Sequence, residues 1–168
     1  LRNIIEDASL NNSPLYICYL DITKDFDSIA HWAIWEILEA YGLPPHFINI
    51  IKSMYTDSNT SLITDFGLTT PLPIERGVKQ GCPLSPLIFI LCLEPLFHWL
   101  EHLNLGYTLT GTNTSISSLG YVDDISIPAS SWNNLQTATT HTYNYLNTYG
   151  LSLGIDHTNH SKSTYTSN

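Results

Sequence analysis

Three acidic residues at the ends of apolar, strand-like runs most constrain how this chain can fold. Residues 15–21 are apolar on both faces and rich in β-formers, and they end at Asp21. Far along the chain, Asp123 and Asp124 separate two further runs of this kind. Such runs predict buried strands. We therefore expect one sheet in which the strand ending at Asp21 lies beside a hairpin whose turn carries Asp123 and Asp124.

The rest of the pattern places helices around these strands. Ser85 is a good N-cap with Pro86 at the first helical position, and Pro95 predicts a kink. The order of elements is typical of an α+β fold with an antiparallel split βαβ (ferredoxin-like) sheet and helices on one face. The predicted helices cover residues 1–8, 31–41, 85–102 and 132–149, and a further one begins at Pro44 or Pro45 and runs to Tyr55. The predicted strands cover 15–21, 60–65, 69–75, 115–121, 125–128 and 151–155.

The charge balance bears on which partners the chain can bind. Its 168 residues suit one domain, and its formal net charge of -9 argues against nucleic-acid binding on bulk electrostatics. A cluster of acids at a metal site would add to that negative count. Four of the six basic residues lie in the motif segments described below, and these are Lys24, Arg76, Lys79 and Lys162.

Cysteine usage and the absence of targeting segments predict an intracellular protein. The three cysteines are odd in number and lack metal-site spacing, which fits a reducing compartment. No segment resembles a signal peptide, and the longest apolar run, 87–93, is too short to span a bilayer. We expect no membrane partner and no secretion. Because the chain begins at Leu1, we also interpret it as an excerpt of a longer protein.

The acids can be interpreted singly or together. Asp21 alone is best explained as a solvated acid where a strand ends. Turns also favour Asp, although usually beside Gly or Asn, which this turn lacks. Adjacent carboxylates repel each other unless a cation neutralises them. If the strands are neighbours, Asp21 and Asp123 form a set of hard oxygen ligands that suits two Mg²⁺ ions about 3.5–4 Å apart, as nucleotidyl transfer requires.

A glycine-rich segment before the fourth predicted helix is the third candidate feature. Gly77 and Gly81 allow close approach of the backbone, and Arg76 and Lys79 add positive charge near a helix N-terminus. A template or nucleotide phosphate would fit such a segment. An ordinary glycine-rich loop is the alternative.

Together these segments resemble the reverse transcriptases of non-LTR (LINE-type) retrotransposons. The run Tyr121-Val-Asp-Asp is similar to the family's Tyr/Phe-x-Asp-Asp motif, and 21–27 is similar to its Asp-x-x-Lys-Ala-Phe-Asp motif. Residues 77–86 resemble its Gly-Val-x-Gln-Gly-Cys-Pro-Leu-Ser-Pro run. The resemblance implies that residues 1–168 form a polymerase palm domain with a trace of the fingers and no thumb.

The resemblance also assigns metal ligands. Asp21 and Asp123 would bind both catalytic ions, which would be Mg²⁺ or Mn²⁺, and Asp124 would assist. The backbone carbonyl of Ile22 would help to hold the ion on the nucleotide side. Lys162 would protonate or steady the leaving pyrophosphate, with a solvated tail lysine as the alternative.

Further residues are assigned to the nucleotide and the template by the same resemblance. Phe26 stands where the family places an aromatic steric gate against the ribose 2′-OH. The expected nucleotide, template or primer contacts are Arg76, Lys79, Gln80, Gly81 and Tyr121. The implied activity extends a DNA primer with dNTPs on an RNA template, in the nucleus or cytoplasm, together with the missing fingers and thumb segments.

Two other interpretations stay open. Asp25 stands where relatives usually have alanine, and together with the acidic balance it motivates a catalytically inactive remnant or an RNA-binding fragment. An RNA-templated RNA polymerase shares the palm. Such enzymes usually place Gly before the paired acids, whereas Val122 stands here.

Overall fold

The computed structural model describes residues 1–23, 25–56 and 58–154, which form two compact units. Within the described part, the first unit holds residues 1–23 and 93–154, and the second holds residues 25–92. The helix α5 (Ser85–Leu103) contributes its beginning to the second unit and its end to the first.

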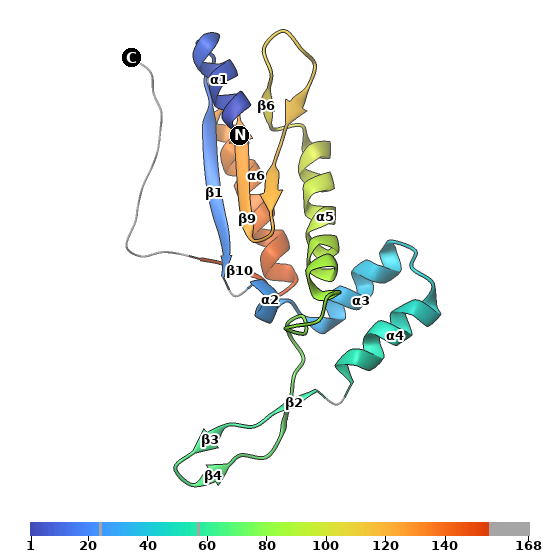
Figure 1. The fold of residues 1–168 in the computed structure, drawn as a ribbon. Coiled ribbons are helices and arrows are strands. Elements are labelled where there is room, and N and C mark those ends of the chain that lie inside the picture. The colour runs from blue at the N-terminus through green and yellow to red at the C-terminus, as the bar shows by residue number, and fades with distance from the viewer. Residues whose placement is uncertain (24, 57, 155–168) are drawn as a thin grey trace. The chain divides into compact units, whose positions relative to one another are not determined.

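A four-stranded sheet forms the centre of the first unit (Figure 1). The strand order is β10-β1-β9-β8, and each strand is antiparallel to its neighbours. The predicted α+β class is therefore confirmed, with the predicted strand at 15–21 in the interior of the sheet. The strands are β1 (Tyr16–Thr23), β8 (Leu119–Tyr121), β9 (Asp124–Ala129) and β10 (Ser152–Leu153).

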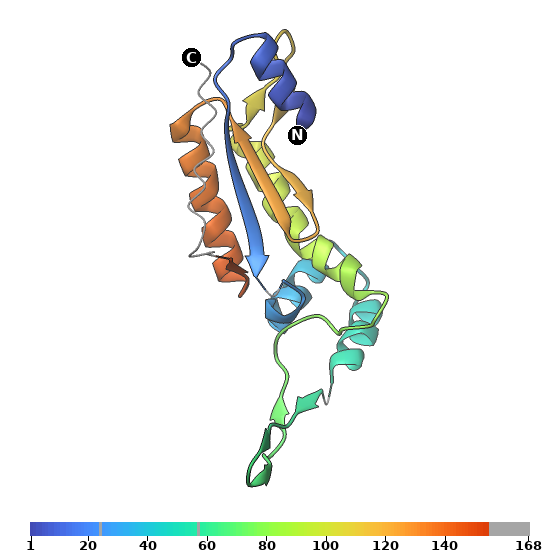
Figure 2. The same ribbon diagram turned by 60° about the vertical axis from the view of Figure 1, so that its left-hand side comes forward.

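The two faces of this sheet differ because side chains alternate along each strand. Ile22, Ile125 and Ile127 are buried on one face. The helix α6 (Trp132–Thr148) covers that face, since Thr139 on α6 hydrogen-bonds to Cys18 (Figure 2). The side chain of Ser131 accepts a hydrogen bond from the Asn134 amide and caps α6. The opposite face carries the exposed residues of β1.

A smaller core lies under the first helix of this unit. The helix α1 (Arg2–Leu10) packs Ile4 and Ala8 against Tyr107. Tyr107 belongs to β6 (Tyr107–Thr108), which pairs with β7 (Ser115–Ile116). The Asp7 carboxylate links α1 to β6 and the segment after it, because it accepts hydrogen bonds from the Tyr107 hydroxyl at 2.8 Å and from the Thr110 amide at 3.1 Å.

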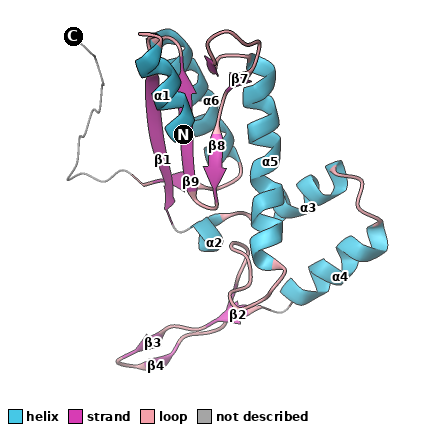
Figure 3. Cartoon of the chain, turned by 45° about the horizontal axis from the view of Figure 1, so that its top comes forward, coloured by secondary structure: helices cyan, strands magenta, loops and turns pink. Residues whose placement is uncertain are grey.

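The second unit combines two packed helices with an extended hairpin (Figure 3). The helices α3 and α4 bury Ile34, Leu38, Ile48 and Ile51. The hairpin exposes Phe66 fully at its tip. The elements are α2 (Asp25–Ser28), α3 (His31–Ala40), α4 (Pro45–Tyr55), β2 (Asn59–Thr60), β3 (Ile63–Thr64), β4 (Gly67–Leu68) and β5 (Leu72–Pro73).

Five local predictions need correction. The predicted strand 60–65 covers β3 and only part of β2, and the predicted strand 69–75 is reduced to β5. The predicted strand 115–121 is two strands, because β7 pairs with β6 while only β8 pairs with β9. Asp124 is the first residue of β9 rather than a turn residue. Ser85 is the first residue of α5 rather than its N-cap, and its hydroxyl donates to the Lys79 carbonyl at 2.6 Å.

The length and apolar composition of α5 are relevant to the expectation of no membrane partner. By length and composition alone it could cross a membrane, and the core helices of soluble proteins pass the same test. The expectation therefore stays a prediction.

Asp7 gives a prediction about stability and pH. Hydrogen bonds from the Thr110 amide and then from Tyr107 hold the pKa of Asp7 below its ordinary value of 3.8. A carboxyl group with a lowered folded pKa stabilises the fold above the unfolded pKa and loses that effect as the pH falls through the folded pKa. Asp7→Asn should therefore lower the Tm at pH 7, and the difference from the wild type should shrink below about pH 4.

Circular dichroism melts at pH 7 and pH 3 would measure this difference. Glu6→Gln is the matched control, because Glu6 pairs with Arg2 on the exposed face of the same helix. Exposed pairs of this kind contribute little. A Tm difference for Asp7→Asn that is the same at both pH values would contradict the assignment.

Candidate active site

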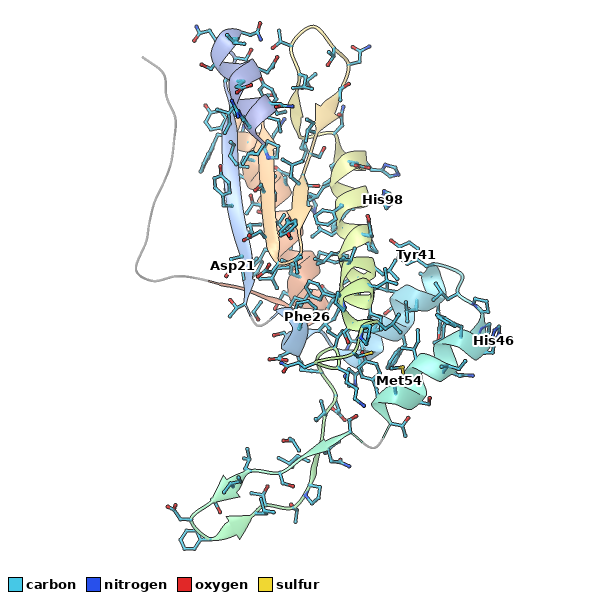
Figure 4. The ribbon with its side chains drawn as sticks, in the orientation of Figure 1. Asp21, Phe26, Tyr41, His46, Met54 and His98 are labelled. Atoms are coloured by element: carbon cyan, nitrogen blue, oxygen red, sulfur yellow. The ribbon has the colours of Figure 1, made fainter. Side chains whose placement is uncertain are left out.

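The predicted acids of the first unit meet at one end of its sheet. Asp21 in β1 lies directly opposite Asp124 in β9, and Asp124 lies directly opposite Tyr121 in β8. Residues opposed in an antiparallel ladder point to the same face. Asp21, Asp124 and Tyr121 therefore form a row across three strands, on the face opposite Ile22 and Ile125. Figure 4 labels Asp21 near the end of β1.

Asp123 lies in the turn that joins β8 to β9. Its carbonyl accepts a hydrogen bond from the Ile22 amide at 3.2 Å, so the turn is tied to the strand that carries Asp21. Val122 precedes it with a φ of 57°. Two-residue hairpin turns need a positive φ, which Gly or Asn usually supplies. A β-branched residue there carries strain of about 1–3 kcal/mol.

The chemistry of the donor set fits a hard divalent cation. Asp21 and Asp124 are exposed and Asp123 is partly exposed, so their carboxylate oxygens can reach an ion that keeps several waters. Cβ atoms of directly opposed residues are roughly 5 Å apart, which is within bridging distance of one ion for two carboxylates. Among the residues that the structure describes, no group of three or more His, Cys, Asp or Glu side chains is gathered closely enough to hold a metal by itself.

The glycine-rich segment of the second unit is fastened along the segment that carries Phe26. The Gly77 amide donates to the Ile29 carbonyl at 2.7 Å, and the Val78 amide donates to the Phe26 carbonyl at 2.6 Å. His31 donates from Nε2 to the Gly77 carbonyl at 2.8 Å. These bonds fix the path of the loop before α5, so it is not an unconstrained linker.

Two residues missed by the sequence reasoning hold predicted site residues in this unit. The Phe26 ring packs on the buried ring of Phe89, with centroids 5.1 Å apart. Gln80 donates from its amide nitrogen to Oδ1 of Asp27 at 2.8 Å. A carboxylate can only accept, so the contact fixes which side of the Gln80 amide faces Asp27. Asp27 adjoins Phe26 in the motif, and this adjacency is the signal that could have found it.

The predicted basic residues are also fixed by local contacts. Lys79 donates from Nζ to the Met54 carbonyl at 3.4 Å, and its amide donates to the Tyr55 hydroxyl at 3.4 Å. Arg76 forms an isolated β-bridge with Ala30. Gly81 has a φ of 78°, and a Cβ built on it would meet nothing within 4 Å. Lys79, as it stands, binds the end of α4.

Three residues named in the sequence analysis lie wholly or partly outside the described part of the chain. Lys24 and Lys162 lie outside the described residues, and the Asp25 side chain is not described. The role predicted for Lys162 therefore stays a prediction, as does the effect of an acid at position 25.

Alanine substitutions of the two loop glycines, Gly77 and Gly81, should lower the free energy of unfolding by different amounts. Both have positive φ, which costs a residue with a side chain about 1–2 kcal/mol. A Cβ on Gly77 would also lie 2.9 Å from the Asp27 Cα and from the Phe26 carbonyl oxygen, whereas one on Gly81 meets nothing within 4 Å. Gly81→Ala should lower the free energy of unfolding by about 1 kcal/mol and Gly77→Ala by about 3 kcal/mol. Urea unfolding measures both, and equal costs would show that the loop is not held against the Phe26 segment.

Comparison with known proteins gives one family. The sequence matches the family described as reverse transcriptase (RNA-dependent DNA polymerase) over residues 1–166. The Pol polyprotein of the type-2 retrotransposable element R2DM of Drosophila melanogaster is 34% identical over 141 residues, covering 84% of this chain and 13% of that protein. A Pol polyprotein of the type-1 retrotransposable element R2 of Popillia japonica is 30% identical, covering 91% of this chain and 25% of that protein.

Solved structures share the fold. Telomerase from Candida albicans superposes with a TM-score of 0.64 at 16% identity, covering 99% of this chain and 30% of that chain. Apo telomerase from Candida tropicalis gives a TM-score of 0.64 at 15% identity, covering 91% of this chain and 30% of that chain. These likenesses are consistent with a polymerase palm-like α+β fold. Since the family match spans nearly the whole sequence, the chain belongs to the reverse transcriptase family, in the group carried by non-LTR retrotransposons.

Proposed function

We propose that this chain is the catalytic part of an RNA-directed DNA polymerase that extends a DNA 3′-OH with dNTPs on an RNA template. The observation that carries the proposal is the register that sets Asp21 opposite Asp124, with Asp123 in the adjoining turn. The family match supports the same activity. The chain spans a quarter or less of the curated relatives named above, so the activity of the whole protein is part of the proposal.

Asp21, Asp123 and Asp124 would hold two Mg²⁺ ions at the end of the sheet. When bound, such ions activate the attacking hydroxyl and neutralise charge on the leaving pyrophosphate. The chain's own contribution is to fix the carboxylates on adjacent strands before the substrate arrives. The Ile22 amide faces the turn that carries Asp123. In an extended strand the carbonyl of a residue points the same way as its amide, which supports a role for the Ile22 carbonyl beside the ions.

The second unit would select and position the nucleotide. Phe26, held by Phe89, would occupy the space that a ribose 2′-OH needs and so favour deoxynucleotides. Gln80, held by Asp27, would present its amide oxygen to the nucleotide or template, and Gly81 would let the backbone approach closely. Arg76 and Lys79 would attract phosphate, and Lys79 would leave the Met54 carbonyl to do so. Tyr121, largely exposed in its strand, would contact the primer end.

The domain assignment is part of the proposal. The segment between β1 and β8 contains α5 together with α2–α4 and the short strands β2–β7, and α6 alone connects β9 to β10. In the sheet, β1 is parallel to β8 and β9 is parallel to β10, and each pair has one antiparallel strand between its members. This order supports a split βαβ palm over residues 1–168 with a trace of the fingers. Lys162 would assist the leaving pyrophosphate. We further propose an intracellular protein, nuclear when chromosomal DNA is the primer, which works with the fingers and thumb of its parent polyprotein.

A catalytically inactive remnant that binds RNA is the alternative. The net charge of -9 favours loss of function over RNA binding, because an acidic surface repels phosphates. The two acids opposed in register favour the enzyme, since an inactive remnant has no need to keep like charges adjacent.

Asp123→Asn tests the activity directly. In this chain expressed with its flanking segments, the substitution should lower dNTP incorporation on an RNA template by about a hundredfold or more, because a lost carboxylate removes several kcal/mol of charge stabilisation. Asp65→Asn, in the turn between β3 and β4, is the control and should leave the rate unchanged. Incorporation that is insensitive to Asp123→Asn would refute the assignment.

Phe26→Val tests nucleotide selection. A smaller side chain leaves room for a 2′-OH, so the preference for dNTP over rNTP, measured as a ratio of kcat/KM values, should fall by about tenfold or more. Phe66→Ala removes a fully exposed ring at the hairpin tip and should not change that ratio. An unchanged ratio in Phe26→Val would exclude the gate.

A further inference from the structure

We propose that Gly154 is a positioning residue for Asp21: the absence of a side chain at Gly154 leaves the space in which the Asp21 carboxylate stands. The inference rests on the proposed function, because it concerns the carboxylate that would hold the metal ions. Gly154 lies just after β10, and nothing in the motif resemblance marks it as part of the site.

Hydrogen bonding and register place Gly154 beside Asp21. The Gly154 amide donates to the Asp21 carbonyl at 2.8 Å. In the ladder between β1 and β10, Ile22 pairs with Leu153 and Thr23 pairs with Ser152. Continuing that register by one residue sets Gly154 opposite Asp21. Opposed residues of an antiparallel pair point to the same face, so a side chain at position 154 would project beside the Asp21 carboxylate.

The space at that position is already filled. A Cβ built on Gly154 would lie 2.9 Å from Oδ2 of Asp21 and 2.8 Å from Oγ1 of Thr23. Ordinary contacts to a methyl carbon are about 3.5 Å or longer, so the carboxylate, the hydroxyl or the strand would have to move. The end of the Asp21 side chain can rotate more easily than the backbone of a paired strand can shift.

Backbone conformation does not account for this glycine. Gly77 and Gly81 have positive φ, which favours glycine at any position, but Gly154 does not. An L-residue could adopt the backbone at position 154 without strain, and the requirement for glycine is therefore steric. Gly154, just after β10, extends the row formed by Asp21, Asp124 and Tyr121, and it confines the Asp21 carboxylate from the side of β10.

Metal binding by the 168-residue chain tests the inference without any measurement of activity. Gly154→Ala should weaken Mn²⁺ binding, measured by calorimetry, by about tenfold or more, as is usual when a group that orients a metal ligand is lost. Ser152→Ala is the matched control in β10, because Ser152 is exposed and opposes Thr23 rather than Asp21, and it should leave the affinity unchanged. Circular dichroism checks that each variant is folded.

Asp21→Asn separates this inference from the proposed function. If Asp21→Asn weakens Mn²⁺ binding and Gly154→Ala does not, the positioning role is wrong and the metal site stands. If neither substitution changes the affinity, Asp21 is not a metal ligand, and both proposals fail.

A stability cycle gives a second readout that needs no metal. Gly154→Ala should lower the Tm more in the wild-type chain than in the Asp21→Ala background, because removing the carboxylate relieves the crowding. The same comparison in the Thr23→Ala background measures the contribution of the Thr23 hydroxyl. Equal Tm losses in the wild-type and Asp21→Ala backgrounds would overturn the inference, even for a variant too unstable for calorimetry.

Discussion

The ladder between β1 and β9 is the interaction on which the candidate site depends. It pairs Tyr16 with Ala129 at one end and Asp21 with Asp124 at the other. Because strand side chains alternate with a period of two, a slip of one residue would turn Asp21 toward the helices and Ile22 toward solvent. Burial of Ile22, Ile125 and Ile127 beneath α6 opposes such a slip. The hydrophobic core therefore fixes the position of the acids at the end of the sheet.

The β8–β9 turn and β10 are both hydrogen-bonded to β1 at the end of the sheet that carries the acids. The positive φ of Val122 makes the turn tight enough to begin β9 at Asp124. The Ile22 amide ties the turn to β1, and the Gly154 amide ties β10 to Asp21 from the other side. The carboxylates of Asp21 and Asp124 repel each other on adjacent strands, and a divalent cation bound between them would offset this repulsion. Catalytic sites commonly store strain and repulsion of this kind.

The sequence carried enough information to predict the main elements. The apolar run before Asp21 and the paired acids predicted the strands, and His31 and Pro45 begin the helices where local propensity indicated. The split at 115–121 could not be predicted, because it depends on β6 and on the docking of α1 through Asp7. The turn was predicted one residue too long, since the sequence offered no Gly or Asn and Val122 takes the positive φ instead.

The supporting residues of the site were harder to predict than its acids. Phe89 and Asp27 act through contacts between segments that are distant in sequence, and Gly154 acts by lacking a side chain where the Asp21 carboxylate stands. A motif shows which residue types recur, but it does not show which neighbours hold them. Side-chain packing is needed to identify such neighbours, as the Cβ distances at Gly154 illustrate.

Anomalous diffraction from crystals of the chain soaked in Mn²⁺ tests whether Asp21, Asp123 and Asp124 share a metal site. We expect an anomalous peak at the open end of the sheet, within about 2.5 Å of carboxylate oxygens from both β1 and the β8–β9 hairpin. The peak should disappear in crystals of Asp21→Asn. Manganese bound elsewhere, with Asp21 and Asp124 both left in solvent, would contradict the account.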